Sequence, residues 1–200
     1  MAVHETTPIE HRVLSVLVEN RAGVLSHVVG LFSARGFNIA SLAVGETEDP
    51  TMSRITLVAE CDEKTFEQIK KQLNKLIDVI KVNDLHEEGF VDRELMLVKM
   101  KNTAQLKNFL KPLMHQYGIR VIEENPKVIT LECVESRENT NKIFGMLKEI
   151  GILEMAQTGA VALSKKVNER TTYGAAGDVK SSARIHPEEA RPRADEGTKR

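Results

Sequence analysis

The residues best suited to bind a small molecule stand in one short segment, Asn20-Arg21-Ala22-Gly23. This segment follows the apolar run 13–18 and precedes apolar residues at helical spacing. The first turn of a helix has free backbone N–H groups and carries the positive end of the helix dipole. Gly23 has no side chain to keep a ligand from this backbone. The pattern therefore predicts a turn that binds a small carboxylate, such as that of an amino acid.

Asn38 is a second candidate, because its amide, like that of Asn20, can both donate and accept hydrogen bonds. Asn38 opens a predicted strand at the far end of the helix that begins after Gly23. It cannot easily reach Gly23 of its own chain, but it could reach the turn of a second chain. This favours a site shared by two chains. The alternative is that the turn is only a tight connection and Asn38 only starts a strand.

Motifs of catalysis and of nucleotide binding are missing from the sequence. The six histidines fall in different predicted elements, without metal-ligand spacing. There is no Gly-x-Ser-x-Gly elbow, no Gly-x-x-x-x-Gly-Lys loop and no dinucleotide fingerprint. Carboxylates lie mostly on polar helix faces and in loops, where solvated charges are usual. We therefore expect no catalytic residue, no metal site and no bound cofactor in this chain.

The composition argues against nucleic acid and membranes as partners. The 200 residues carry a net charge of -1, aromatic residues make up 4%, and Trp is absent. No apolar run reaches the length of a membrane span, and the polar start lacks the apolar part of a signal peptide. Cys61 and Cys133 lie far apart among strand-like residues and are predicted to be buried free thiols. The expected location is the cytoplasm.

Hydrophobic periodicity places the glycine turn within a βαββαβ unit. Asp62 is a plausible N-cap for the second helix, and Gly36 after Arg35 ends the first. The predicted strands are 13–18, 37–44, 54–59 and 79–82; the first helix is 24–35, and the second follows Asp62 and has its apolar stripe within 66–76. This order is typical of a ferredoxin-like domain, with two helices on one face of a four-stranded antiparallel sheet.

The same order then repeats more weakly. The predicted strands are 95–100, 119–122, 128–131 and 152–163, the last interrupted near Gly159, and the helices are 106–117 and 143–150. Thr103 can cap the first of these helices, and Pro112 inside it should produce a kink or divide it into two pieces; we expect the kink. In place of the glycine turn the second copy has Lys101-Asn102-Thr103-Ala104, without glycine. That difference indicates a special task for the first copy.

The predicted fold class is therefore α+β, with two consecutive ferredoxin-like βαββαβ domains and a disordered C-terminal tail. The tail contains almost no large apolar residues and cannot bury enough surface to offset its ordering entropy. The expected division is a flexible N-terminus 1–11, a first domain 12–86, a linker 87–94, a second domain 95–165 and the disordered tail 166–200.

Residues 16–25 and 30–39 closely resemble the ACT domain of the small subunit of acetohydroxyacid synthase, also called acetolactate synthase. The resemblance continues through 53–54, 67–76 and 93–99, and it covers about 12–163. It makes the first unit an ACT domain and the second an ACT-like domain. The second half departs from the family, with Glu123-Glu124 where Asp and a small or apolar residue are usual. Gln157-Thr158-Gly159 stands where Arg-Thr-Gly is usual.

The resemblance implies a regulatory subunit without a catalytic site. In the family, the small subunit binds and activates a large catalytic subunit that carries thiamine diphosphate, Mg2+ and usually FAD. It also confers feedback inhibition by valine on branched-chain amino-acid synthesis, and valine sits between the ACT domains of a homodimer. Carried over by position, the effector residues would be Asn20, Ala22, Gly23, Val24 and Leu25 of one chain, with Asn38 and Ile39 of the other.

Three alternatives belong to other classes. The chain could be a free-standing ACT sensor for another enzyme, although the extended family match argues against this. A ferredoxin-like RNA binder needs exposed aromatics on its central strands, and Val16, Ile55 and Leu57 are aliphatic instead. An enzyme in its own right would form acetolactate without a catalytic subunit.

Overall fold

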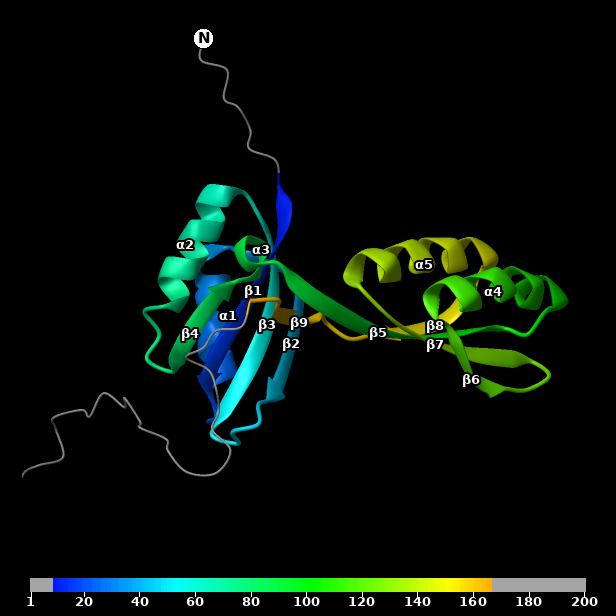
Figure 1. The fold of residues 1–200 in the computed structure, drawn as a ribbon, viewed down its shortest axis with the longest axis horizontal. Helices are drawn as coiled ribbons and strands as arrows, with labels where there is room; N and C mark the ends of the chain where they lie inside the picture. Colours follow the sequence, from blue (N-terminus) through cyan, green and yellow to red (C-terminus); the bar gives the residue numbers. More distant parts are fainter. Residues whose placement is uncertain (1–8, 167–200) are drawn as a thin grey trace, which may run out of the picture. The chain divides into compact units, whose positions relative to one another are not determined.

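The computed structural model describes residues 9–166 and contains both predicted βαββαβ units. The first consists of β1 (Glu10–Glu19), α1 (Val24–Arg35), β2 (Asn38–Glu46), β3 (Met52–Cys61), α2 (Glu63–Leu73) and β4 (Val79–Asp84). Its sheet has the order β2-β3-β1-β4, with antiparallel pairs throughout. Helices α1 and α2 pack on one face of this sheet (Figure 1). The predicted ferredoxin-like arrangement is confirmed.

Every residue of β1 from 13 to 18 is buried, and burial on both faces explains why this run is apolar except for Ser15. Leu14 and Val16 face the core beneath α1 and α2. Val13 belongs to a smaller cluster on the opposite face, where it packs with Ala160 and Ala162. The central strand of the first domain is therefore covered by its own helices on one side and by the end of the described chain on the other.

The second unit repeats the arrangement around a core of its own. It consists of β5 (Phe90–Lys101), α4 (Ala104–Tyr117), β6 (Arg120–Glu124), β7 (Val128–Glu135), α5 (Arg137–Ile150), β8 (Ile152–Gln157) and β9 (Val161–Ser164). Strands β6-β7-β5-β8 form the sheet, and the predicted interruption near Gly159 separates β8 from β9. Helix α4 runs through Pro112 as one element, so it is not divided into two pieces.

The predicted caps of both domains are confirmed. The Asp62 side chain accepts a hydrogen bond from the Thr65 N–H at 2.7 Å, which also lowers the pKa of the Asp62 carboxyl. Thr103 accepts one from the Leu106 N–H at 3.1 Å. Cys61 and Cys133 are buried free thiols, as predicted. The predictions for residues 1–8 and for the tail 167–200 lie outside the described residues.

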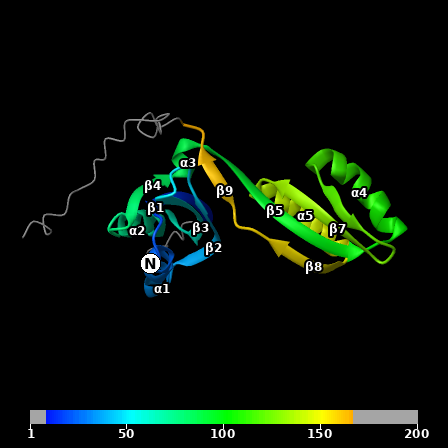
Figure 2. The same ribbon diagram turned by 90° about the horizontal axis from the view of Figure 1, so that it is seen from below.

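Residues 87–94, predicted to be a polar linker, are instead part of regular structure. They include the end of α3 (Leu85–Glu88) and the first part of β5, which pairs with β9 (Figure 2). Leu85 is fully buried, and Phe90 packs against the same cluster. These two apolar residues fix the polar residues between them to the first domain. The sequence does not predict this regular structure, because the intervening residues are polar and the pairing partner of β5 lies about seventy residues further along the chain.

The connection between β8 and β9 lies against β2. The Ala160 N–H donates to Ser41 Oγ at 3.1 Å, and a Cβ on Gly159 would lie 2.5 Å from the Leu42 carbonyl oxygen. Glycine is therefore required at this position by close approach of two backbones.

Gly159→Ala is expected to lower the free energy of unfolding by about 1–3 kcal/mol, because the new methyl group must displace backbone. Gly145→Ala in α5 is the matched control, since a Cβ there meets nothing within 4 Å. The control should stabilise the chain by up to about 1 kcal/mol through helix propensity. Urea unfolding of the two variants checks this, and equal midpoints would contradict the close contact.

Candidate ligand-binding turn

The turn between β1 and α1 is built around the backbone of Gly23. This residue is the N-cap of α1 and has φ 91° and ψ -18°, a left-handed conformation that favours glycine. No side chain caps the helix, and a Cβ on Gly23 would meet nothing within 4 Å. The space in front of the helix N-terminus is therefore open.

Helix α1 differs in this respect from the other long helices. Side-chain oxygens cap α2, α4 and α5, from Asp62, Thr103 and Ser136 respectively. At α1 the Val24 N–H makes only a long bond of 3.4 Å to the Arg21 carbonyl, and within residues 9–166 the N–H groups of Leu25 and Ser26 donate to no protein acceptor. Two amides at a positive helix end are thus available to an anionic group.

Asn20 is held by the loop between β2 and β3. Its Nδ2 donates to Glu46 Oε1 at 3.0 Å and to the Pro50 carbonyl at 2.9 Å, while its backbone N–H donates to the Thr51 carbonyl at 2.7 Å. Both amide hydrogens are therefore in use. Only the Asn20 side-chain oxygen remains for a ligand.

The second domain shows that this arrangement does not depend on a ligand. Asn102, which follows β5 as Asn20 follows β1, donates from Nδ2 to Glu124 Oε1 at 3.1 Å and to the Asn125 carbonyl at 2.7 Å. The same pair of contacts occurs in a copy without the glycine turn. The interpretation of Asn20 as a structural residue is accordingly favoured for its amide group.

The apolar residues predicted to contact the ligand differ in burial. The Val24 side chain is 4% exposed and packs in the core, so it offers little surface to a ligand. The cause is helical phase, since Val24, Val28 and Leu31 share the face turned to the sheet. Leu25 is 42% exposed, and Ala22 is exposed as well.

Asn38 and Ile39 lie at the other end of α1. The helix has 12 residues, so about 18 Å separates its two ends. Asn38 is exposed and donates to Glu60 Oε2 at 2.9 Å, and Ile39 is half-buried. The structure does not bring these two residues to Gly23 of the same chain. Strand β2, which carries them, is an edge strand of its sheet.

Arg21, to which the sequence assigned no role, joins two residues that sequence reasoning missed, His27 and Asp78. Arg21 Nη2 donates to Asp78 Oδ1 at 2.8 Å. His27 Nδ1 lies 2.9 Å from Asp78 Oδ2 and is the donor, because a carboxylate only accepts. These contacts lower the pKa of the Asp78 carboxyl, the bond from His27 more than that from Arg21. The sequence offers no signal for them, since Asp78 is one polar residue about fifty positions from the turn.

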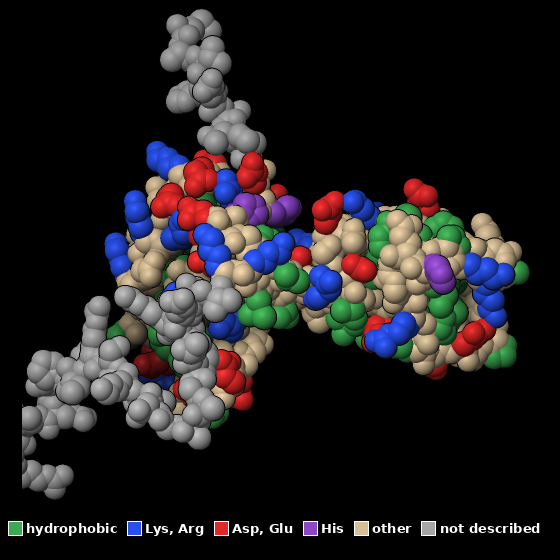
Figure 3. Space-filling model, in the orientation of Figure 1, with side chains coloured by type: hydrophobic (Ala, Val, Ile, Leu, Met, Phe, Trp, Pro, Cys, Tyr) green, Lys and Arg blue, Asp and Glu red, His purple; other side chains and the backbone are tan. Residues whose placement is uncertain are grey.

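Other parts of the described structure offer no comparable chemistry. A hollow of about 460 Å³ lies between the end of β2 and β9, and none of the predicted ligand residues lines it. Within residues 9–166 no three His, Cys, Asp or Glu side chains are grouped as metal ligands, and no helix is long and apolar enough to cross a membrane. On the face in Figure 3, acidic and basic side chains are interspersed over the first domain.

Comparison with known proteins finds one family match for each of the two βαββαβ domains. Residues 14–81 match the family described as AHAS small subunit-like ACT domain, and residues 93–166 match the family described as small subunit of acetolactate synthase. The chain is 41% identical over 155 residues to the acetolactate synthase isozyme 3 small subunit of Salmonella typhimurium, covering 77% of this chain and 95% of that protein. It is 42% identical over 152 residues to the acetolactate synthase small subunit of Mycolicibacterium smegmatis, covering 76% and 89%.

A solved structure agrees in fold. The acetolactate synthase small subunit of Thermotoga maritima superposes with a TM-score of 0.70 at 34% identity, covering 80% of this chain and 99% of that one. The two-domain fold and the glycine turn thus define an ACT-domain protein. The chain belongs to the acetolactate synthase small-subunit family. This membership and the ACT domain support a regulatory-subunit role.

The contacts of Asp78 predict a dependence of stability on pH. Because its pKa is lower in the folded than in the unfolded chain, its stabilising effect is complete above the ordinary value of about 3.9 and is lost as the pH falls through the folded value. Asp78→Asn should therefore lower the Tm at pH 5, and the difference should shrink below about pH 4. Thermal unfolding across this range checks it; a difference independent of pH would be the contrary result.

Proposed function

We propose that this chain is the regulatory small subunit of an acetolactate synthase, which activates a large catalytic subunit and makes it sensitive to valine. The carrying observation is the uncapped N-terminus of α1 behind Gly23, in a chain whose relatives are named acetolactate synthase small subunits. The catalytic partner is expected to hold the thiamine diphosphate, Mg2+ and FAD. This chain contributes regulation and no catalytic group.

The effector carboxylate would bind the N–H groups of Leu25 and Ser26, where the helix dipole adds about 0.3–2 kcal/mol. Ala22 and Gly23 leave room for the ligand backbone, and the exposed Leu25 side chain offers apolar contact. Valine exceeds alanine by two methyl-sized groups, each worth about 0.8 kcal/mol when buried. The Leu25 side chain can cover only part of the valine side chain, so further apolar residues are needed to bury the rest.

A second copy of the chain would supply further apolar contact. Asn38 and Ile39 are too far from Gly23 of their own chain, and they lie on edge strand β2, whose outer side pairs with no strand among residues 9–166. Pairing of two ACT domains along β2 would bring Asn38 and Ile39 of one chain toward the turn of the other. The turn is then half of a site, and the homodimer completes it.

Valine bound there can inhibit only through a difference in affinity between two arrangements of the assembly. A coupling free energy of about 1–3 kcal/mol corresponds to a change in affinity of about 5- to 150-fold. The experiment is to co-purify the chain with a candidate catalytic subunit and to titrate acetolactate formation with valine, leucine and isoleucine. Activation by the chain with inhibition by valine is the expected result. Clear acetolactate formation by the chain alone would contradict the regulatory role.

Gly23→Asp is expected to weaken inhibition by valine at least about tenfold while leaving activation largely intact. Aspartate at an N-cap accepts hydrogen bonds from the first-turn N–H groups and would occupy the place of the ligand carboxylate. Gly118→Asp is the matched control, because Gly118 also has a positive φ and open space but lies at the C-terminus of α4. Inhibition curves of the assembled enzyme check this. Wild-type valine sensitivity of Gly23→Asp would show that the site is elsewhere.

A further inference from the structure

The two domains share one scaffold but differ at two connections. Two residues, Arg21 and Ala22, stand between Asn20 and the cap of α1, whereas Asn102 is followed directly by the cap of α4. Residues 74–78 connect α2 to β4, whereas Gly151 alone connects α5 to β8. The first domain therefore has two extra segments that the second domain lacks.

These two extra segments meet at Asp78. Its carboxylate accepts from Arg21 through Oδ1 at 2.8 Å and from His27 through Oδ2 at 2.9 Å, so it joins residues on both sides of Gly23. Its backbone carbonyl accepts from the Glu19 N–H at 3.0 Å. The Asp78 side chain is 9% exposed, and both its oxygens are engaged. It is thus placed to hold the turn and not to contact a ligand directly.

We propose that Asp78 is the positioning residue of the effector turn, fixing the backbone of residues 21–27 so that the N–H groups of Leu25 and Ser26 converge on one carboxylate. This inference rests on the proposed function. It assigns the loop before β4, which carries none of the predicted site residues, to effector binding through the Arg21 and His27 side chains.

An electrostatic role and a positioning role of Asp78 predict opposite effects of Asp78→Asn on the affinity for a carboxylate. Asp78 is an anion beside a site for an anionic group, so removal of its charge should strengthen carboxylate binding if electrostatics alone mattered. If Asp78 fixes the turn, the same change should weaken binding, because the amides lose their arrangement. The sign of the effect of Asp78→Asn on affinity therefore separates the two roles.

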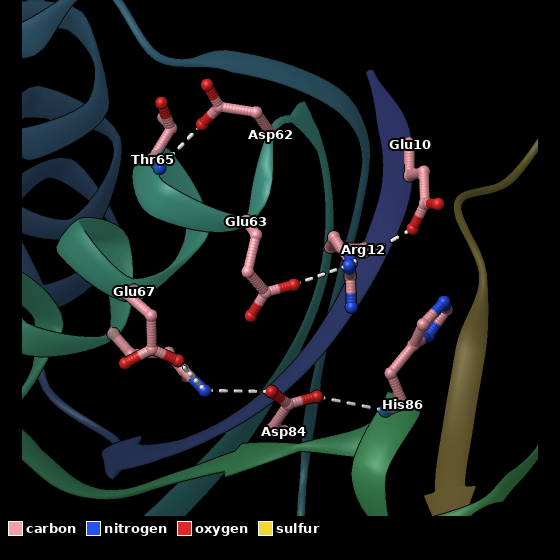
Figure 4. A network of polar contacts seen from close by, with 9 residues as sticks. Glu10, Arg12, Asp62, Glu63, Thr65, Glu67, Asp84 and His86 are labelled. Carbon is pink, nitrogen blue, oxygen red and sulfur yellow. Dashed lines mark hydrogen bonds and ion pairs between the residues drawn. The ribbon is translucent and has the colours of Figure 1, made fainter. Parts of the chain in front are cut away.

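Asp84 provides a matched control at the other end of β4. Its side chain is also 9% exposed and also paired, accepting from Lys70 Nζ at 2.9 Å and from the His86 N–H at 3.0 Å. Figure 4 shows this carboxylate between its partners, among residues of α2, α3 and β1. None of them belongs to the glycine turn. Asp84→Asn thus removes an equivalent paired charge away from the proposed site.

The test is calorimetric titration of the full chain with valine, together with the Tm of each variant. Asp78→Asn is expected to weaken valine binding about tenfold, whereas Asp84→Asn should lower the Tm and leave affinity within about twofold of wild type. Arg21→Gln should reproduce part of the loss. The double variant Arg21→Gln/Asp78→Asn should lose little more than Asp78→Asn alone, since both changes break the contact between Arg21 and Asp78.

The outcomes distinguish a positioning role of Asp78 from a general loss of stability and from failure of the proposed function. Unchanged or tighter binding by a folded Asp78→Asn chain would overturn the positioning role while leaving the effector site in place. Equal weakening by Asp78→Asn and Asp84→Asn would show that general loss of stability is responsible, and it would overturn the role as well. If Asp78→Asn fails to fold, Arg21→Lys decides, because it keeps the positive charge but not the geometry of the guanidinium contact, with full affinity as the contrary outcome. A wild-type dimer that binds no branched-chain amino acid would overturn the proposed function itself.

Discussion

The first N–H groups of an α-helix need partners from outside the helix, and among the long helices of residues 9–166 only α1 has no side-chain cap for them. Helices α2, α4 and α5 use an aspartate, a threonine and a serine, whereas α1 begins at a glycine with φ 91°. The left-handed backbone of Gly23 brings the chain into the helix without a side chain over its end. The space in front of the helix is therefore open, and no side chain lies over the N–H groups of Leu25 and Ser26.

The duplicated scaffold separates structural features from functional ones. An asparagine after the first strand ties the following turn to a hairpin loop in both domains, through the same two kinds of acceptor. Features found only in the first domain are Gly23, the inserted Arg21 and Ala22, and the longer loop that ends at Asp78. Those features also lie together in space. The second domain therefore serves as a comparison within one molecule, and it accounts for the N–H groups of the Asn20 side chain without a ligand.

Local signals made most of the fold predictable. Strand periodicity, the caps Asp62 and Thr103, and the helix-ending Gly36 depend on neighbours a few residues away, and all are found as expected. The failures depend on distant partners. The pairing of β5 with β9 and the bond from Arg21 to Asp78 join residues more than fifty positions apart. The burial of the Val24 side chain depends on helical phase, which places it on the core face of α1.

Amides that lack a protein acceptor must turn to water or to a ligand, and this links ligand binding to folding. A molecule that binds only the folded chain adds a stabilisation of RT ln(1 + [L]/Kd), about 2.7 kcal/mol at one hundred times Kd. On the proposed function, the subunit becomes more resistant to unfolding and proteolysis as the end product accumulates. The missing cap of α1 would then make the lifetime of the subunit, as well as the activity of its partner, a readout of the amino-acid pool.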